Sequence, residues 1–462
     1  MIQKELVKQK LYEKYIEPTK RKREDYIGVE IEMPIINLKK QAVDFDIIHK
    51  FTKEFIDDFG FEIEELDDEG NIISAISPIT KDILSYDCSY NNLELSFGRE
   101  KDKDTIYARF EKYYKYIQDE FSKFNYTLSG MGVNPYRIYN QNKPIPNGRY
   151  RMLFNHLNSF KKYLDLPMHF HDYPNYGLFS SASQVQLDVD YDNLITTINA
   201  FSKLEPINAL LFSNSVFLGE NEDLLCCRDY FWENSMHGIN PHNIGMFDCE
   251  LKGIEDLQAY IESTSIYCVE RDKKYINFKP INIIEYFAQE YVIGEYFDGE
   301  KYKEIKIIPR LEDINYLRTF KFEDLTFRGT IEFRSVCCQP IHDSMLVAAF
   351  HLGLMKQADK LNELLDNDNS IYHHGYNASE LRKLLVKKEL PYFVDEDKVY
   401  ELAEEIVDLS KKGLIERGFG EEKYLEPLYE RIRNRSNPGR KMLKLLENGS
   451  KIEDVINEYS KI

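Results

Sequence analysis

Four short segments of this chain alternate polar and apolar residues with a period of two, and their polar positions are rich in carboxylate, amide and guanidinium groups. In the first, 26–33, Ile27, Val29 and Ile31 alternate with Glu30 and Glu32. Because successive side chains of a strand point to opposite faces, both glutamates project from the same face. Two neighbouring carboxylates repel each other unless a cation lies between them. The segment therefore predicts a strand that presents a metal-binding pair.

The same alternation occurs in segments 91–97, 183–191 and 327–334. A sheet with one solvated face gives this pattern, and solvation is the alternative interpretation for any single strand. Lys is absent from the polar positions of all four segments, whereas Glu, Gln, Asn, Asp and Arg fill them. These are the groups that hold Mg²⁺ and phosphate. In chain order, the polar positions of the three later segments are Asn92, Glu94, Ser96, Gln184, Gln186, Asp188, Asp190, Arg328, Thr330, Glu332 and Arg334.

The net charge and the cysteine content exclude several classes of protein. A formal net charge of −19 argues against nucleic acid as a partner, because phosphates would be repelled. The sequence contains no apolar run of about 18 residues, so no membrane span is predicted. The charged N-terminal segment lacks the apolar core of a signal peptide, so a cytoplasmic location is expected. The 7 cysteines include no Cys-x-x-Cys pair, so zinc is not expected and the thiols are expected to be buried and reduced.

The predicted strands and helices lack regular βαβ spacing, which favours an α+β fold. Segments 129–150 and 218–248 are rich in Gly, Pro and other loop residues, and punctuated loops between core elements often carry binding groups. We predict one catalytic domain over 1–462, with a mostly helical part at 343–462. Two further strands are predicted at 61–65 and 71–76, and helices at 1–24, 44–59, 101–124, 150–163, 192–213, 255–262, 282–288, 343–365, 378–386, 395–413, 421–433 and 437–457, with Gly413 and Gly418 as breaks.

Seven segments, in order along the chain, resemble glutamate–cysteine ligases of the plant and proteobacterial type. Each match is short, but together they span residues 26 to about 450. The segments are Gly28-Val-Glu-Ile-Glu32, Leu93-Glu-Leu95, Gly130-Met-Gly-Val-Asn-Pro135, Pro146-Asn-Gly-Arg-Tyr150, Val185-Gln-Leu-Asp-Val-Asp190, Ile331-Glu-Phe-Arg334, and Gly413 to Gly418 with the helical sequence beyond it.

The resemblance implies a glutamine-synthetase-like α+β fold, in which a curved, largely antiparallel sheet forms a funnel covered by helices. It also implies an ATP- and Mg²⁺-dependent ligase of glutathione biosynthesis, with Mn²⁺ as a possible substitute. Such enzymes phosphorylate the γ-carboxylate of L-glutamate, and the amine of L-cysteine, or here of another acceptor, displaces phosphate. A monomer or a homodimer fits this expectation.

The residue types then suggest a role for each candidate. Glu30, Glu32, Glu94 and Glu332 are expected to hold Mg²⁺, because hard cations prefer carboxylate oxygen, although a surface ion pair is the alternative for each. Gln184 and Gln186 are expected to contact metal or ATP, or only to hydrogen-bond within the sheet. Arg334 is expected to act with Glu332 in catalysis by neutralising the transferred phosphoryl group. Arg149 is a second candidate contact for an anion. Arg228, with the neighbouring Trp232, is a candidate site for a substrate carboxylate. The pairs His169/His171 and His373/His374 lack further ligands at metal spacing and are not expected to be catalytic.

Three departures from the family pattern concern the amino-acid substrates, and one of them is Asp188, where the family's Val-Gln-Val-Asn strand has Asn. The family has an acidic residue near the position of Cys337 or Cys338, and an Asp-Arg-Thr-Gly stretch where this chain has His242-Asn-Ile-Gly245. A basic substrate contact is therefore expected to be lost. Two alternatives remain: a γ-glutamyl ligase that uses another amine, and a non-catalytic relative that binds nucleotide or amino acid. Retention of the four glutamates and Arg334 argues against the second.

Overall fold

The structure is a computed structural model that describes residues 2–163, 166, 168–368 and 376–462. His373 and His374 lie outside the described residues. In the part of the chain that it describes, no helix is long and apolar enough to cross a membrane.

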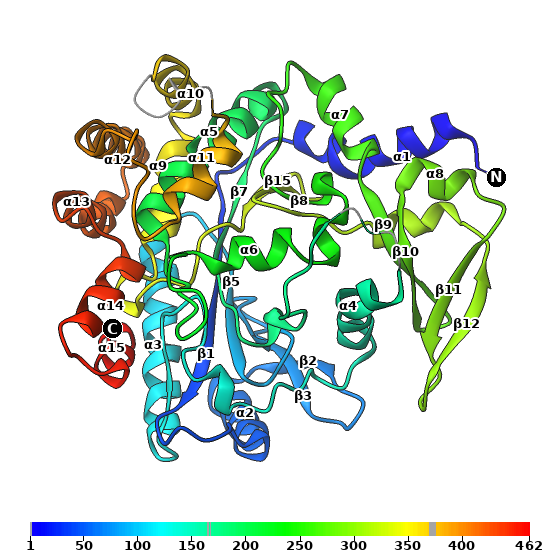
Figure 1. Ribbon diagram of the computed structural model, residues 1–462, viewed down its shortest axis with the longest axis horizontal. Helices are drawn as coiled ribbons and strands as arrows, with labels where there is room; N and C mark the ends of the chain where they lie inside the picture. The colour runs from blue at the N-terminus through cyan, green and yellow to red at the C-terminus, as the bar shows by residue number, and fades with distance from the viewer. Residues whose placement is uncertain (1, 164–165, 167, 369–375) are drawn as a thin grey trace.

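A large antiparallel sheet forms the centre of the molecule (Figure 1). Eight of its nine strands follow the order β14-β15-β7-β1-β5-β4-β3-β2, and β6 pairs with the far end of β1. All of these pairings are antiparallel, which confirms the predicted α+β class with a largely antiparallel sheet and helices. The strands are β1 (Ile27–Asn37), β2 (Glu62–Leu66), β3 (Ile72–Ile76), β4 (Ile83–Tyr86), β5 (Asn92–Glu100), β6 (Tyr126–Leu128), β7 (Ser183–Asp188), β14 (Glu323–Leu325) and β15 (Thr330–Phe333).

The two faces of this sheet differ as the sequence predicted. The apolar positions of β1, β5, β7 and β15 are buried under helices α3 (Lys103–Ser122), α5 (Leu194–Phe212) and α9 (Leu346–Met355). Phe333 of β15, for example, packs its ring 4.5 Å from that of Phe201 on α5 and 4.7 Å from that of His351 on α9. Burial of this apolar face fixes which side of each strand carries the polar groups, since a slip of one residue would exchange the faces.

Helix α2 (Phe45–Phe59) shows how local signals set the elements near the site. The Asp44 carboxylate accepts a hydrogen bond from the Asp46 amide at its N-terminus, and Gly60 ends it with φ of +65°. Ile48, Phe51 and Phe55 lie on one face and are buried. The predicted bounds of this helix and of β2 and β3 agree with the structure to within one residue.

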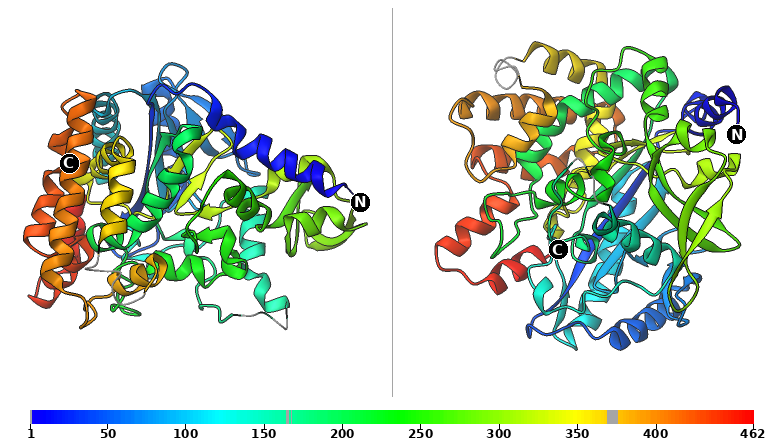
Figure 2. Two further views of the ribbon diagram at one scale, coloured as in Figure 1. Left: turned by 90° about the horizontal axis from the view of Figure 1, so that it is seen from above. Right: turned by 45° about the vertical axis from the view of Figure 1, so that its right-hand side comes forward.

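A second antiparallel sheet, which the sequence analysis did not predict, lies beside the first (Figures 1 and 2). Helix α1 (Lys4–Tyr15) packs against α7 (Ile254–Glu262) and α8 (Ile283–Ala288) at this end, and α4 (Gly148–Asn158) packs on β10. The strands of this second sheet, which follow residue 262, therefore lie next to α4. Its strands, in spatial order, are β12 (Tyr302–Ile307), β11 (Val292–Phe297), β10 (Lys274–Asn282) and β9 (Ser265–Arg271), and a short parallel pair joins β8 (Ile244–Gly245) to β13 (Phe320–Lys321).

The C-terminal part is helical, as predicted, but two of its features differ from the prediction. The segment 343–365 forms two helices, α9 and α10, rather than one. Gly413 does not end a helix but lies inside α12, where a Cβ atom would stand 2.0 Å from the Gly353 carbonyl oxygen of α9. The glycine is therefore required for close helix packing, and α12 ends at Gly418. The remaining helices are α10 (Ala358–Asn367), α11 (Ala378–Leu385), α12 (Glu396–Arg417), α13 (Glu426–Arg433), α14 (Pro438–Glu447) and α15 (Ile452–Tyr459).

Two other predicted segments are corrected. The strand expected over 327–334 is shorter, because Phe327, Arg328 and Gly329 form the turn between β14 and β15, with φ of +74° at Gly329. Arg328 therefore lies in a turn rather than on a strand. Segment 218–248, expected to be irregular, contains helix α6 (Cys227–Glu233).

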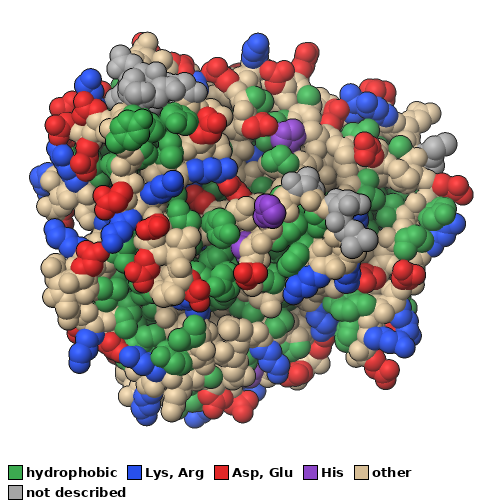
Figure 3. Space-filling view, viewed as in Figure 1, with side chains coloured by type: hydrophobic (Ala, Val, Ile, Leu, Met, Phe, Trp, Pro, Cys, Tyr) green, Lys and Arg blue, Asp and Glu red, His purple; other side chains and the backbone are tan. Residues whose placement is uncertain are grey.

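Charged side chains of both signs are spread over the face seen in Figure 3, while hydrophobic side chains gather toward its middle. The thiols agree with the expectation, since all 7 cysteines are free and every one except Cys249 is buried.

Candidate active site

Two adjoining cavities lie on the polar face of the central sheet. The outer one, here called the acidic cavity, has a volume of about 650 Å³ and is lined by the four predicted glutamates. The second, here called the inner chamber, has a volume of about 130 Å³ and lies between this face, α4 and α6. The residues that line both are Glu32, Asp87, Arg149, Tyr150, Gln184 and Arg334. They form the boundary at which groups bound in the two cavities would meet.

Strand register brings the glutamates together. Glu32 on β1 lies opposite Glu94 on β5, and Glu30 lies opposite Gln184 on β7. Glu332 on β15 lies opposite Gln186 on β7, one strand farther along. Residues directly opposite in an antiparallel pair share a face. The four carboxylates come from three strands that are widely separated in sequence.

Mutual repulsion and burial act on these carboxylates. Burial, followed by the charges of Asp87 and Glu94, raises the pKa of Glu32 to about 8. Burial and then the Glu94 and Glu332 carboxylates raise the pKa of Glu30 well above its ordinary value. The pKa of Glu94 is also raised, first by burial and then by Asp87. A bound cation would reverse these shifts, because it favours the ionised form.

The donor set fits a hard cation. The four carboxylates and the Gln184 amide offer oxygen ligands, and the buried Gln184 Oε1 has no hydrogen-bond partner. Among the described residues, no three His, Cys, Asp or Glu side chains form a ready-made metal site. That is compatible with Mg²⁺, which is usually held by one or two carboxylates and completed by water and substrate phosphates.

Hydrogen bonds fix three of the carboxylates and both glutamines. Glu32 accepts bonds of 2.7 Å from the Ala182 amide and from Gln184 Nε2. Gln186 Nε2 donates to Glu30 at 3.1 Å and to Glu332 at 3.3 Å, and its Oε1 accepts from Arg328 at 2.7 Å. Gln186 therefore bridges the glutamates within the sheet, whereas Gln184 lines both cavities.

Arg334 follows β15 and reaches the boundary between the cavities. Its guanidinium lies 2.8 Å from a carboxylate oxygen of Glu332. Burial acts to lower the pKa of Arg334, but the nearby carboxylates of Glu332, Asp324 and Glu30 outweigh it and raise the pKa further. The group is a permanent cation held beside the acidic cluster.

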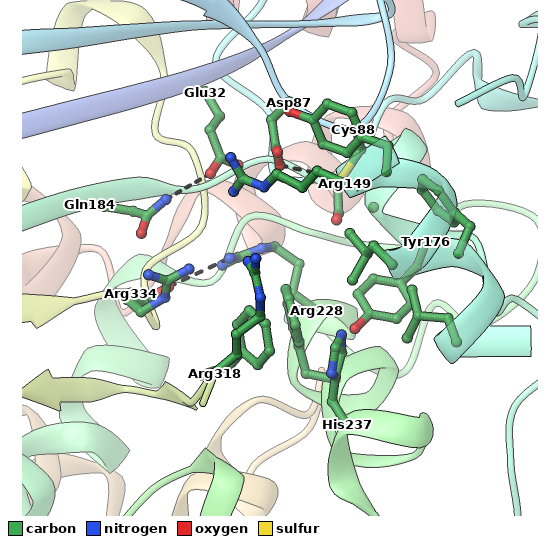
Figure 4. Close-up of a pocket in the computed structure, with 18 of the residues that line it drawn as sticks. Glu32, Asp87, Cys88, Arg149, Tyr176, Gln184, Arg228, His237, Arg318 and Arg334 are labelled. Carbon is green, nitrogen blue, oxygen red and sulfur yellow. Dashed lines mark hydrogen bonds between the residues drawn. The ribbon is translucent and has the colours of Figure 1, made fainter. Parts of the chain in front are cut away.

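Arg149 comes from the opposite wall, at the start of α4. The Asn147 side chain accepts the Arg149 amide hydrogen at 2.7 Å and so begins the helix. The helix is thereby oriented so that Arg149 lines both cavities, facing Glu32 across the boundary (Figure 4). By contrast, the resembling loop Gly130–Pro135 lines neither cavity. A Cβ at Gly132 would lie 2.8 Å from the Cys337 Cβ, so that loop serves close packing.

Helix α6 places Arg228 and Trp232 in the inner chamber. Arg228 is buried and donates to the main-chain oxygens of Ser335 at 3.1 Å and Arg334 at 3.5 Å. The helix itself is held by Asp229, which accepts two hydrogen bonds, at 2.7 and 3.1 Å, from Arg382 of α11. The same guanidinium bonds Glu205 of α5 at 2.5 Å.

Three site residues escaped the sequence analysis: Asp87, His237 and Arg318. Asp87 follows β4, His237 lies in a short 3-10 helix over Met236–Ile239, and Arg318 lies in the loop before β13. Each lies outside a periodic segment, so local sequence gave no signal for it. Long-range packing alone brings them to the cavities.

Of the histidines expected to be non-catalytic, the described pair His169 and His171 stays outside both cavities. His171 accepts a hydrogen bond from the Tyr173 amide at 2.9 Å and bonds the Phe231 carbonyl through its other ring nitrogen. Neither His169 nor His171 lines the acidic cavity or the inner chamber.

Comparison with known proteins extends the resemblance. The glutamate–cysteine ligase of tomato (Solanum lycopersicum), described as chloroplastic, is 25% identical over 326 residues, which is 68% of this chain. Glutamate–cysteine ligase A of rice (Oryza sativa subsp. indica) is 26% identical over 331 residues, or 69% of this chain. The chain is thus similar to plant glutamate–cysteine ligases over about two thirds of its length. The predicted resemblance is therefore confirmed.

The match to these ligases has limits. It covers 57% of the length of the tomato protein and 61% of that of the rice protein. Among solved structures, the glutamate–cysteine ligase of Francisella tularensis in complex with AMP is 12% identical, with a TM-score of 0.48 over 96% of this chain and 88% of that one. No family model matches the chain.

Proposed function

We propose that this chain is an ATP-dependent ligase that joins the γ-carboxylate of glutamate to the amine of cysteine. The observation that carries the proposal is the acidic cavity itself, in which Glu30, Glu32, Glu94 and Glu332 face one space that opens onto a chamber rich in arginine. The sequence relatives named for this reaction support the same conclusion.

The acidic cavity is assigned to the triphosphate and Mg²⁺. Carboxylates alone would repel ATP, and a magnesium ion held by these carboxylates would supply the positive charge that neutralises the triphosphate. Glu30, Glu32, Glu94 and Glu332 would hold it, with the free Gln184 Oε1 as a further oxygen donor. Mn²⁺, which also accepts oxygen ligands, is a possible substitute.

The first step is phosphoryl transfer at the boundary. A γ-carboxylate oxygen of glutamate attacks the γ-phosphorus of ATP, an O–P bond forms, and the bond to ADP breaks. Arg334 offers a forked donor to the equatorial oxygens in the transition state, and Arg149 faces it from α4. Glu332, 2.8 Å from Arg334, holds that guanidinium in place. Positioning and charge neutralisation carry most of the catalysis.

The second step joins the two amino acids. The amine lone pair attacks the γ-carbonyl carbon, a C–N bond forms, the C–O bond to phosphate breaks, and phosphate leaves with the electron pair. The amine proton departs with phosphate or to solvent. Arg228, buried next to Arg334, is suited to hold the α-carboxylate of glutamate while this occurs.

A second candidate, transfer of the γ-glutamyl group to a different amine, rests on a specific observation. The segment that departs from the family pattern supplies no cation to the inner chamber. His242 contacts the Ser263 hydroxyl and the Asp248 carboxylate, at 3.2 Å, and Asn243 bonds main-chain groups. Cys337 and Cys338 are buried and line neither cavity.

The experiment is a phosphate-release assay with ATP, Mg²⁺ and glutamate, to which each amino acid is added in turn. Hydroxylamine serves as a small trap for γ-glutamyl phosphate. Release that depends on cysteine supports the proposal, and release with another amine supports the second candidate. Binding of ATP without release under any of these conditions refutes both and leaves a non-catalytic nucleotide-binding protein.

A further inference from the structure

The wall of the inner chamber carries more positive charge than its own carboxylates neutralise. Arg149, Arg228, Arg318 and Arg334 all line it (Figure 4). Of these four, only Arg334 has a carboxylate partner within 4.0 Å among the ion pairs of the described residues. Three carboxylates also line the chamber, Glu32, Asp87 and Asp229, and Asp229 is already paired with Arg382. Arg228 is buried and Arg318 half-buried, and cations shielded from solvent without a carboxylate partner are costly, so the chamber is suited to anions that arrive with a ligand.

Arg318 is the least expected of these cations. It lies in the inner chamber but not in the acidic cavity, and its Nε is buried without a hydrogen-bond partner. Its main chain is fixed, because the buried Asn243 side chain donates to the Arg318 carbonyl at 3.1 Å. Asn243 is itself held by two hydrogen bonds of 2.7 Å to the main chain of Ser265. The segment that lacks the family's basic residue therefore positions a different arginine.

A second group of unpartnered atoms lies beside Arg318. His237 is 4% exposed, and neither of its ring nitrogens has a hydrogen-bond partner. Its ring packs between Trp232 and Phe320, with centroids 5.3 and 4.4 Å away. Burial, His156 and Arg318 together lower the pKa of His237 well below its ordinary value, so the ring is neutral. The Tyr267 hydroxyl, in the same wall, is also buried and unpartnered.

Buried polar atoms are almost always satisfied in folded proteins, so such a cluster around one cavity indicates a polar ligand. At roughly 10–15 Å³ for each water-sized group, 130 Å³ holds on the order of ten of them. That is the size of a small amino acid.

In the proposed reaction, the α-carboxylates of glutamate and of the acceptor need two different binding sites. Phosphate leaves toward the acidic cavity, so the amine attacks from the side of the inner chamber. Two amino acids bring two α-carboxylates, and Arg228 and Arg318 are two cations beyond the boundary that have no carboxylate partner. Arg228 is bonded to the main chain of Arg334, where the donor reacts. Arg318 remains for the acceptor.

Resting on the proposed function, we infer that the inner chamber binds the acceptor as an amino acid whose carboxylate is held by Arg318. Its small side chain, carrying a hydrogen-bonding atom such as a thiol or hydroxyl, lies against His237.

The test compares acceptors that differ only in the carboxylate. The twenty standard amino acids are first screened for ADP release with ATP, Mg²⁺ and glutamate, and the best is paired with its decarboxylated amine; cysteine and cysteamine are the expected pair. The intact protein should prefer the amino acid at least tenfold in kcat/KM. Arg318→Met should reduce this preference at least tenfold, by raising the KM of the amino acid, and Arg318→Lys should restore part of it. Exposed Arg310, eight residues earlier, provides the control Arg310→Met, which should leave the ratio unchanged.

The outcomes separate the inference from the function on which it rests. Absence of ADP release even with hydroxylamine refutes the proposed ligase. Hydroxamate formation with no preference for an amino acid over its amine overturns the inference alone. So does an Arg318→Met variant whose KM for glutamate rises instead of that for the acceptor. His237→Phe tests the side chain: it should lower the preference for cysteine over 2-aminobutyrate, and an unchanged preference removes His237 from the site.

Discussion

The direct opposition of Glu32 and Glu94 across β1 and β5 predicts that the metal-free protein becomes less stable as the pH rises. In the folded state the pKa of Glu32 is about 8, against an ordinary value of 4.5. The folded state therefore binds more protons than the unfolded chain between these values. The stability that this group contributes is fully present below pH 4.5 and is lost as the pH rises toward 8. At about 1.4 kcal/mol for each unit, the shift corresponds to at most about 5 kcal/mol.

Replacing Glu94 by Gln should restore part of the free energy of unfolding that is lost at high pH. Directly opposite carboxylates stand about 5 Å apart, and at an effective dielectric constant of about 20 their repulsion is about 3 kcal/mol. The amide can still accept the hydrogen bond that Ser96 donates at 2.6 Å. Because the neighbouring Arg149 charge offsets part of the repulsion, the variant should be about 1–3 kcal/mol more stable than the original protein at pH 8. At pH 5 the two should be equal, since Glu32, whose pKa is about 8, is then protonated and no longer repels Glu94.

Urea unfolding followed by circular dichroism in EDTA, at pH 5 and pH 8, measures this difference. The matched control is Glu64→Gln, an exposed glutamate on the wall of the same cavity, which should change stability by less than about 0.5 kcal/mol at both pH values. Adding Mg²⁺ at pH 8 should stabilise the original protein more than the Glu94 variant. A Glu94→Gln protein that is no more stable at pH 8, or is stabilised equally at both pH values, would show that the two carboxylates do not repel each other in the folded state.

Three further substitutions test other parts of the structure. Glu332→Gln should lower turnover at least about a hundredfold in the ADP-release assay without changing the circular dichroism spectrum, and full activity would remove Glu332 from the site. Gly132→Ala should cost about 1–3 kcal/mol in urea unfolding, because its Cβ would stand 2.8 Å from that of Cys337. Gly253→Ala, in open space, should stay within about 0.5 kcal/mol, and equal effects of the two would contradict the packing argument. Arg382→Met should cost about 3–5 kcal/mol, because it leaves Glu205 and Asp229 buried without their cation, whereas a loss no larger than that from exposed Lys383→Met would refute the buried network.

Several elements were predictable from the sequence because their signals are local. Alternation in 26–33 and 91–97 placed Glu30, Glu32 and Glu94 on polar strand faces, and the spacing of Ile48, Phe51 and Phe55 defined α2. Prediction failed where a distant contact decides the local structure. Gly413 was expected to end a helix, but its lack of a side chain instead lets α12 pack against Gly353 of α9. The four-stranded sheet β9–β12 was missed altogether.

The sequence by itself determined which side chains share a face, since periodicity depends only on neighbouring residues and the burial of apolar groups. It could not determine which strands are neighbours, because pairing is set by packing between segments far apart in the chain. Strand order and register put Glu32 opposite Glu94 and brought Glu332 to the same cavity. Only the tertiary structure placed Arg318 and His237 in the inner chamber, because both lie in aperiodic segments whose positions depend on contacts such as the Asn243 hydrogen bond.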